Sequence, residues 1–168
     1  MIACRAATPD DSEALHGLFD SVFCETFGHL YRREDLESFR SSFGIADWQR
    51  QLADPAFAVR VAEADGVLAG YIKIGPVKLP VDRKSSSLLI DQLYVRNEHH
   101  GTGIARELMD WAIGESRRRG AQALYLTVFI DNHRARRFYD RHGFEAVGRY
   151  AFMVGSQADE DIIMRKTL

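Results

Sequence analysis

Residues 90–119 constrain the fold of this chain more than any other segment. An apolar strand pattern runs to Val95, the glycine pair of Gly101-Thr102-Gly103 comes soon after, and an amphipathic helix begins there without a polar linker. A helix that begins at a glycine turn presents unpaired N–H groups and the positive end of its dipole, and glycine lets a phosphate approach the backbone. This stretch therefore predicts an anion site for a phosphate-bearing ligand.

The segments around this stretch predict an α+β fold. We expect strands at residues 2–6, 57–63, 67–77, 88–95, 123–130, 144–152 and 161–166, and helices from Thr8-Pro9, within 25–43, at 46–52, from Gly101, and from Asp131 or Asn132 to His142-Gly143. Asp65-Gly66 is a strong hairpin signal, and the strand, helix, strand order around Gly101 predicts a parallel βαβ unit with a right-handed crossover. The expected fold is a mixed, mostly antiparallel sheet of six to seven strands, flanked by about four helices with the βαβ unit in its middle.

Size and composition favour one domain without a nucleic-acid or membrane surface. The chain has 168 residues, of which 46% are hydrophobic, and a net charge of −2. This length suits one core, so we expect a single domain over residues 1–168, and the charge predicts no nucleic-acid partner. No apolar run approaches the roughly 20 residues of a membrane span. Two cysteines without a CxxC motif or a signal peptide favour the cytoplasm.

Two well-known glycine motifs do not fit the turn. A P-loop needs a Gly-Lys pair, and the chain contains none. A Rossmann fingerprint needs a third small residue and lies after a first strand, whereas Gly103 is followed by Ile104, Ala105 and Arg106 in the middle of the chain. Both nucleotide-binding interpretations are therefore disfavoured.

Two segments resemble the GNAT superfamily of N-acetyltransferases. They read LYVRNEHHGTGIARELM and, about 30 residues later, VFIDNHRARRFYDRHGF. The resemblance implies a bulged strand at residues 93–95 whose N–H groups pair with the pantetheine and thioester of acetyl-CoA, and a loop that holds its pyrophosphate. The implied cofactor-binding residues are Leu93, Tyr94, Val95, His100, Gly101, Thr102, Gly103, Ile104, Ala105, Arg106, Asn132, Arg134 and Phe138.

The loop departs from the family pattern at two positions. Glu98 stands where the family prefers Gln or Arg, and His100 stands where Arg is common. The backbone cradle does not depend on these side chains.

A closer resemblance, to the PaiA-like polyamine acetyltransferases, is carried by Glu25-Thr26-Phe27, the strand with Tyr94, and the segments 152–153 and 161–168.

Tyr139 is the main catalytic candidate. It follows Asn132 by seven residues, two helical turns, so both side chains can share one face. A phenol remains protonated at neutral pH and is acidic enough to reprotonate a leaving thiolate. The resemblance places a thiol-protonating Tyr and a CoA-contacting Asn at these positions. The alternative is that Tyr139 is a core aromatic and Asn132 only an N-cap.

The residue that deprotonates the amine is less defined. A primary amine with a pKa of about 10 is mostly protonated at pH 7 and needs a base. Alternation along the strand puts Leu89, Asp91, Leu93 and Val95 on one face, which makes Asp91 a candidate that acts through water; Asp91 is equally compatible with a structural acid. Glu25 and Glu37 are alternatives, and Glu25 and Tyr31 are candidate acceptor-binding residues.

The expected function is direct transfer of an acetyl group from acetyl-CoA to a primary amine of a small molecule, with a polyamine-like acceptor among the possibilities. The alternatives are a non-catalytic acyl-CoA sensor or regulatory module and a protein or peptide N-acetyltransferase. His99 and His100 lack a third ligand at usable spacing, so no metal is expected. The aromatic-rich strands after Gly143 are candidates for pairing in a homodimer.

Overall fold

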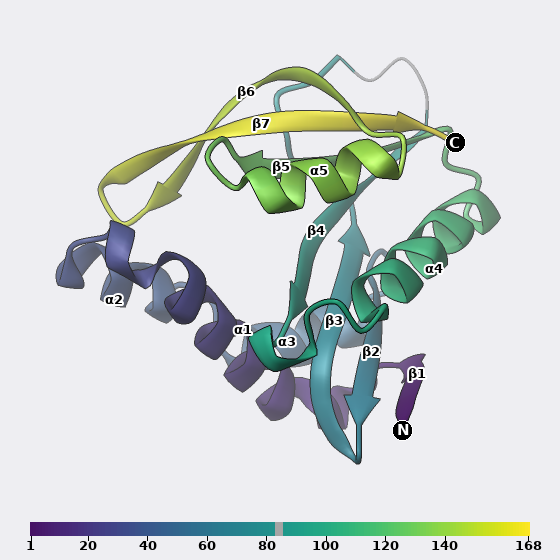
Figure 1. Ribbon diagram of the computed structural model, residues 1–168, viewed down its shortest axis with the longest axis horizontal. Helices are drawn as coiled ribbons and strands as arrows, with labels where there is room; N and C mark the ends of the chain where they lie inside the picture. Colours follow the sequence, from purple (N-terminus) through teal and green to yellow (C-terminus); the bar gives the residue numbers. More distant parts are fainter. Residues whose placement is uncertain (83–85) are drawn as a thin grey trace.

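A computed structural model of the chain describes residues 1–82 and 86–168 (Figure 1). The polar, turn-rich residues 79–87 predict a surface loop, which lies partly outside the described residues. In chain order the elements are β1 (Ile2–Ala6), η1 (Pro9–Asp11), α1 (Ser12–Phe27), η2 (Gly28–Leu30), α2 (Arg33–Ser41), α3 (Ile45–Ala53), β2 (Ala58–Ala64), β3 (Val67–Gly75), β4 (Ser87–Val95), η3 (Asn97–His99), α4 (Ile104–Arg118), β5 (Ala123–Phe129), α5 (His133–Arg141), β6 (Glu145–Val154) and β7 (Gln157–Thr167).

The strands form one seven-stranded sheet in the order β1-β2-β3-β4-β5-β7-β6. Every neighbouring pair is antiparallel except β4 and β5, which are parallel and joined by α4. The expected α+β class, the central βαβ unit and the β2–β3 hairpin are therefore confirmed. Asp65 and Gly66 both have positive φ angles, 50° and 81°, as a tight two-residue hairpin turn requires.

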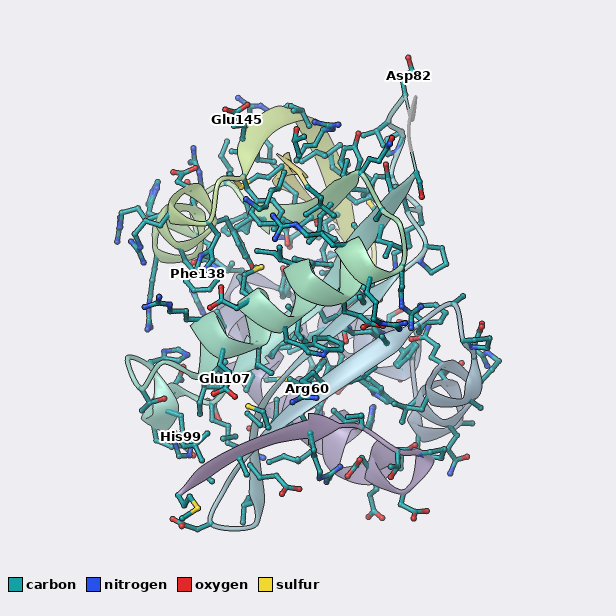
Figure 2. The ribbon with its side chains drawn as sticks, turned by 90° about the vertical axis from the view of Figure 1, so that its right-hand side faces the viewer. Arg60, Asp82, His99, Glu107, Phe138 and Glu145 are labelled. Atoms are coloured by element: carbon teal, nitrogen blue, oxygen red, sulfur yellow. The ribbon has the colours of Figure 1, made fainter. Side chains whose placement is uncertain are left out.

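Two hydrophobic layers cover the two faces of the sheet. Figure 2 shows α4 crossing the face that it shares with α5, where Ile104, Leu108 and Leu126 are buried. Helices α1 and α3 cover the opposite face of the amino-terminal strands, where Leu15, Leu18 and Trp48 are fully buried. No helix among the described residues is long and apolar enough to cross a membrane.

The residue spacing after Gly101 predicts that one face of α4 packs on the sheet, and the observed buried face differs from this face in register. The predicted face consists of Ile104, Leu108, Trp111, Ala112 and Glu115. Ile104, Leu108 and Ala112 are buried as predicted, but Met109, Ile113 and Ser116 complete this face instead of Trp111 and Glu115. The side chain of Trp111 lies at the edge, 5.8 Å from the Arg60 guanidinium, and Glu115 pairs with Arg118 and Arg119. The buried residues recur with the 3.6-residue period of a helix, and the centre of the observed face is rotated by about one residue from the predicted one.

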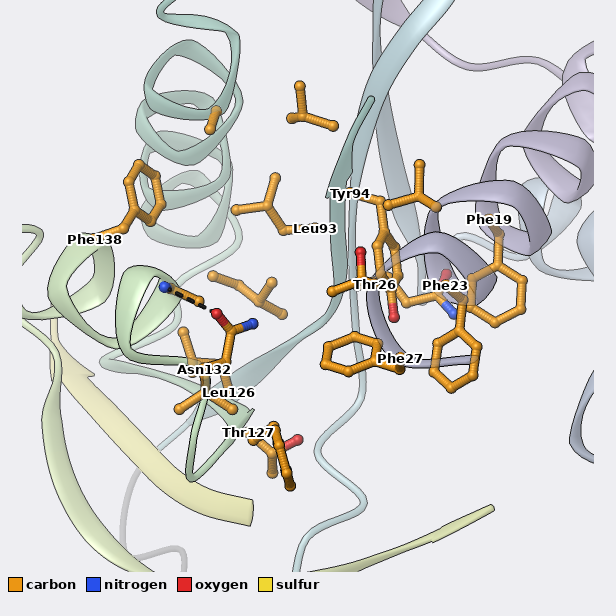
Figure 3. Close-up of a pocket in the computed structure, with 18 of the residues that line it drawn as sticks. Phe19, Phe23, Thr26, Phe27, Leu93, Tyr94, Leu126, Thr127, Asn132 and Phe138 are labelled. Atoms are coloured by element: carbon orange, nitrogen blue, oxygen red, sulfur yellow. Dashed lines mark hydrogen bonds between the residues drawn. The ribbon is translucent and has the colours of Figure 1, made fainter. Parts of the chain in front are cut away.

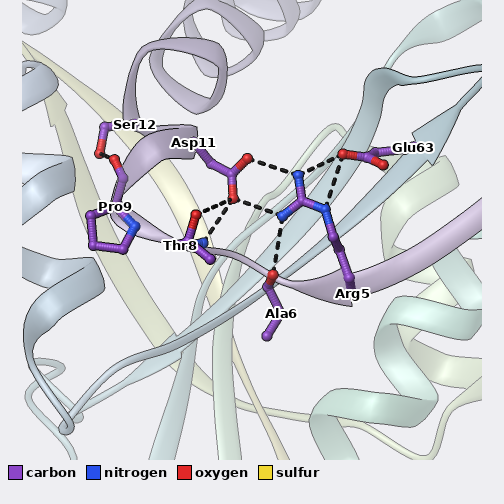
Figure 4. Close-up of polar contacts among 7 residues, drawn as sticks. All are labelled: Arg5, Ala6, Thr8, Pro9, Asp11, Ser12 and Glu63. Atoms are coloured by element: carbon purple, nitrogen blue, oxygen red, sulfur yellow. Dashed lines mark hydrogen bonds and ion pairs between the residues drawn. The ribbon is translucent and has the colours of Figure 1, made fainter.

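An ion-pair network fixes the amino-terminal strand (Figure 4). The Arg5 guanidinium donates to both Asp11 carboxylate oxygens at 2.8 Å and also pairs with Glu63 on β2. Asp11 in turn accepts the Thr8 backbone N–H at 2.8 Å. The helix expected from Thr8-Pro9 therefore begins with the short 3-10 turn η1, and the α-helix starts at Ser12.

Strands β4 and β5 separate soon after they pair, and this separation opens a cavity in the sheet. Their parallel ladder joins only Ser87, Leu88 and Leu89 to residues 123–125, whereas β4 stays paired with β3 as far as Val95. The register shifts at Asp91, because Lys73 pairs with Gln92 and Ile74 with Ile90. Asp91 is thus the extra residue of a β-bulge, which corrects the expected position at residues 93–95.

Candidate active site

The gap between β4 and β5 opens into a cavity of about 900 Å³. It reaches from the glycine turn before α4 through the sheet to the aromatic side chains of α1. Figure 3 shows Phe138 and Asn132 on one side of the gap, Phe19, Phe23 and Phe27 on the other, and Leu93 and Tyr94 on the strand between them. The cavity therefore connects the polar glycine turn to a group of aromatic side chains.

The glycine turn forms a cradle at the entrance of this cavity. Gly101 and Gly103 have φ angles of 80° and 90°, in the left-handed region that favours glycine. A Cβ atom added to either would meet no protein atom within 4 Å, so the space above this backbone is open. Gly103 is the N-cap of the 15-residue helix α4, whose first N–H groups lie beside that space. Most of the residues expected to hold the pyrophosphate line the cavity, namely Gly101, Gly103, Ile104, Ala105 and Arg106. Thr102 does not line it and donates its hydroxyl to the His99 carbonyl at 2.6 Å.

His100 connects this entrance to α5. Its Nε2 lies 2.9 Å from the Val95 carbonyl oxygen, and its Nδ1 lies 2.5 Å from an Arg134 guanidinium nitrogen. Arginine can only donate, so Nδ1 accepts and Nε2 carries the proton that is donated to Val95. His100 thus holds the Arg134 guanidinium near the glycine turn. This guanidinium supplies a positive charge there, although the chain lacks the arginine that the GNAT pattern commonly has at position 100.

The edge of β4 that faces the gap carries free backbone groups. In an antiparallel pair of strands every second residue hydrogen-bonds to the partner strand. The Arg96 N–H donates to the Ala69 carbonyl at 2.8 Å, so Arg96, Tyr94 and Gln92 are the residues of this part of β4 that bond to β3. Leu93 and Val95 then direct their N–H groups into the gap. The family resemblance implies that the N–H groups of residues 93–95 bind a pantetheine and a thioester; the separation from β5, rather than a bulge, leaves those of Leu93 and Val95 free, whereas the backbone of Tyr94 is bonded to β3.

Helix α5 brings Asn132, Phe138 and Tyr139 to the cavity. Asn132 is also the N-cap, since its Oδ1 accepts the Ala135 N–H at 3.3 Å (Figure 3, dashed line). Tyr139 is 9% exposed, and its hydroxyl makes no hydrogen bond with another described residue. Burial raises the pKa of Tyr139 to about 12, so the phenol stays protonated at neutral pH.

Asp91 is held between two ammonium groups. Lys73, only 1% exposed, approaches it at 3.1 Å, and Lys78 approaches it at 2.8 Å. Burial alone would raise the pKa of Asp91, but the charges of Lys73 and Lys78 outweigh that effect and lower it. Lys73 also donates to Gln51 at 2.7 Å and lies over the ring of Trp48 at 4.6 Å. A carboxylate paired in this way is a weak base, so the arrangement favours the structural alternative for Asp91.

Hydrogen bonds tie Tyr31, between α1 and α2, and Asp35 on α2 to the β6–β7 hairpin near the far end of the cavity. The Tyr31 hydroxyl donates to Asp159 on β7. Asp35 on α2 accepts both the backbone N–H and the hydroxyl of Ser156, at 2.7 and 2.8 Å, in the turn between β6 and β7. Glu25 lines the cavity but is exposed, and it accepts from Asn97 at 3.1 Å and from Ser21 at 3.0 Å. Glu37 does not line the cavity and pairs with Arg33.

The structure adds two acids that the sequence reasoning missed. Asp159 and Asp161 on β7 line the cavity and are 8% and 6% exposed. Burial raises the pKa of Asp161 to about 6, while a hydrogen bond with Thr127 opposes this shift and the charge of Asp159 adds to it. The signal was present in the sequence: counting back in steps of two from the buried Ile163 puts both acids on one face of the strand.

Neither thiol lies at the cavity, and no metal cluster is found within residues 1–82 and 86–168. Cys4 and Cys24 are half-buried, are absent from the cavity lining, and have pKa values raised by burial. The described His, Cys, Asp and Glu side chains form no group of three or more that would hold a metal ion.

Comparisons of sequence and of structure with known proteins all find similarity to acetyltransferases. The family model described as the acetyltransferase (GNAT) family matches residues 19–144. An L-amino acid N-acetyltransferase, AaaT of Escherichia coli, is 30% identical over 168 residues, which cover 94% of this chain and 93% of that protein. An uncharacterized N-acetyltransferase of Mycobacterium tuberculosis is 29% identical over 136 residues, 80% of this chain and 83% of the relative. The crystal structure of the PaiA N-acetyltransferase of Thermoplasma acidophilum in complex with coenzyme A superimposes with a TM-score of 0.79 at 20% identity, covering 100% of this chain and 99% of the other.

Proposed function

Because the chain belongs to the acetyltransferase (GNAT) family, we propose that it binds acetyl-CoA and transfers the acetyl group directly to a primary amine of a small molecule. The observation that carries this proposal is that the glycine cradle, the free edge of β4 and Tyr139 all line the same cavity. An acetyl thioester needs its phosphates held, its carbonyl polarised and its leaving thiolate protonated. The cavity offers one element for each requirement.

The residues divide these tasks along the cavity. The N–H groups of residues 101–106 hold the pyrophosphate at the start of α4, and Arg134, positioned by His100, adds a positive charge. Leu93 and Val95 donate their free N–H groups to the pantetheine and the thioester oxygen. Tyr139 protonates the thiolate, since its phenol lies buried in the cavity with its hydroxyl unengaged. Neither cysteine lines the cavity, which favours direct transfer over an acyl-enzyme.

A small acceptor is favoured over a protein or peptide. The hydrogen bond from Tyr31 to Asp159 lies at the far end of the cavity, and the hydrogen bonds from Ser156 to Asp35, outside the cavity lining, tie α2 to the turn between β6 and β7. An extended peptide would need an open groove there. A compact amine, including a polyamine or an amino acid such as the name of the E. coli relative implies, requires no such opening.

The test is calorimetric titration with acetyl-CoA followed by a free-thiol assay over spermidine, aminoglycosides, amino acids and a peptide with a free N-terminus. We expect acetyl-CoA to bind and a small amine to release CoA. A protein that binds acetyl-CoA but releases no thiol with any amine would be the sensor alternative. Release with the peptide alone would point to a peptide acetyltransferase.

A further inference from the structure

Asp161 is a buried acid without a cationic partner. It lies on β7 opposite Phe129 of β5, and its side chain is 6% exposed at the cavity wall. Among the described residues no Lys, Arg or His pairs with it, and the Thr127 hydroxyl is its hydrogen-bond partner. A buried carboxylate is costly unless a cation compensates its charge. A positively charged group of the ligand would therefore supply the missing compensation.

The surroundings of Asp161 suit an organic ammonium ion. Phe23, Phe27 and Tyr31 from the α1 region line the same cavity, with Phe27 edge-on to Phe129 at 6.2 Å and Tyr31 stacked on Phe23 at 6.0 Å. Aromatic rings attract cations through their faces and pack against alkyl groups. Asp159, on the same face of β7, accepts from the Tyr31 hydroxyl and so stays directed at this end of the cavity.

We propose that Asp161 binds the ammonium group of the acceptor and accepts its proton, so that the acceptor is a compact alkylamine that is cationic in solution. This inference rests on the proposed acetyl transfer. The ammonium gives one proton to the Asp161 carboxylate, the neutral nitrogen forms a C–N bond with the thioester carbon, and the C–S bond breaks. Tyr139 protonates the thiolate, and the second proton leaving the nitrogen restores the phenol. The proton on Asp161 returns to solvent.

The electrostatics of the site agree with this role. The polar groups around Asp161 are Asp159 on its own strand, Thr127 on β5, Tyr94 on β4, Tyr31 before α2, and Tyr150 opposite it on β6. Burial raises the pKa values of Tyr31 and Tyr94, so both phenols stay neutral. With a pKa of about 6, Asp161 is an anion at pH 7.5 and a stronger base than an exposed aspartate.

The Asp161→Asn variant tests the proposal with two amines at pH 7.5. For a basic alkylamine, kcat/KM should fall on the order of 10²-fold or more, because the base is lost. For trifluoroethylamine, which is mostly neutral at that pH, the fall should be much smaller. Acetyl-CoA affinity should stay unchanged. The control is Glu160→Gln, since Glu160 is exposed on the neighbouring position and pairs with Arg149, outside the cavity.

The pH profile supplies a second, independent readout. In the wild-type enzyme kcat/KM for the alkylamine should rise through a pKa near 6. Thr127→Val removes the hydrogen bond that favours the carboxylate, so it should move this limb to higher pH, whereas Asp161→Asn should abolish it.

Equal losses for both amines, or an unchanged acidic limb in the Thr127→Val enzyme, would overturn the role of Asp161. A wild-type protein that releases no CoA with any amine would instead overturn the proposed function.

Discussion

Replacing Tyr139 with phenylalanine removes one hydroxyl and leaves the packing of the ring intact. The ring lies edge-on to Phe138 at 5.5 Å and to Phe144 at 6.0 Å, and both contacts survive the substitution. The hydroxyl makes no hydrogen bond with another described residue. We therefore expect the free energy of unfolding to change by less than about 1 kcal/mol.

The effect on turnover should be far larger. A positioned proton donor contributes roughly 10²–10⁴-fold to a rate, which corresponds to about 3–5 kcal/mol in the transition state. The raised pKa of about 12 keeps Tyr139 protonated throughout the neutral range, so the loss should be similar at every pH between 6 and 9. The assay is free-thiol release at saturating amine, with the acetyl-CoA dissociation constant measured by calorimetry.

Tyr125→Phe is the matched control, because this tyrosine is also buried, lies on β5 and does not line the cavity. Its kcat should equal that of the wild type. A Tyr139→Phe enzyme with the wild-type kcat would refute the assignment of Tyr139 as the proton donor. A large loss of acetyl-CoA affinity with unchanged kcat would make it a binding residue instead.

Three further predictions follow from individual contacts. Gly103→Glu should abolish acetyl-CoA binding in calorimetry, because the new side chain fills the cradle and carries the same charge as the phosphates. The control is Gly120→Glu, which should bind normally, since Gly120 has a similar φ of 80° and equally open surroundings but lies outside the cavity; equal affinity of the two variants would exclude the cradle. Asp91→Asn leaves the Lys73 ammonium buried with no counter-charge and should lower the urea-measured stability by about 3–5 kcal/mol, and wild-type stability would contradict the ion pair. Hydrogen bonds from Arg118 and Arg119 lower the pKa of Glu115 to about 2, so Glu115→Gln should cost about 1 kcal/mol at pH 7, and the difference from wild type should vanish as the pH falls from 4.5 to 2; a difference that persists at pH 2 would contradict this origin.

Local signals in the sequence located the strands and helices well. Asp65-Gly66 predicted the hairpin because a tight turn needs backbone conformations that few residues adopt, and the structure has them there. The order of strand, helix and strand around Gly101 predicted the parallel unit, and β4 and β5 pair in parallel. At the amino terminus the prediction was less accurate, since the contact of Asp11 with Arg5 favours a 3-10 turn before the helix.

The chemistry of individual acids was harder to predict because it depends on neighbours that are distant in sequence. Asp91 is tied to Lys73 by the pairing of β3 with β4, and no local pattern reveals that contact. The position of the bulge likewise depends on the partner strand. Asp161 was accessible in principle from the alternation along β7, but its isolation from cations appears only when β5, β7 and α1 are assembled around the cavity.

The most direct test of the proposed activity is mass spectrometry of the complete reaction mixture, with and without a small primary amine. With the amine, we predict acetylated amine and CoA in equal amounts while the protein keeps its unmodified mass. Without the amine, acetyl-CoA and the protein should both remain unchanged. Acetylated protein formed in the absence of amine would contradict direct transfer, and intact acetyl-CoA with every amine tested would contradict the acetyltransferase activity itself.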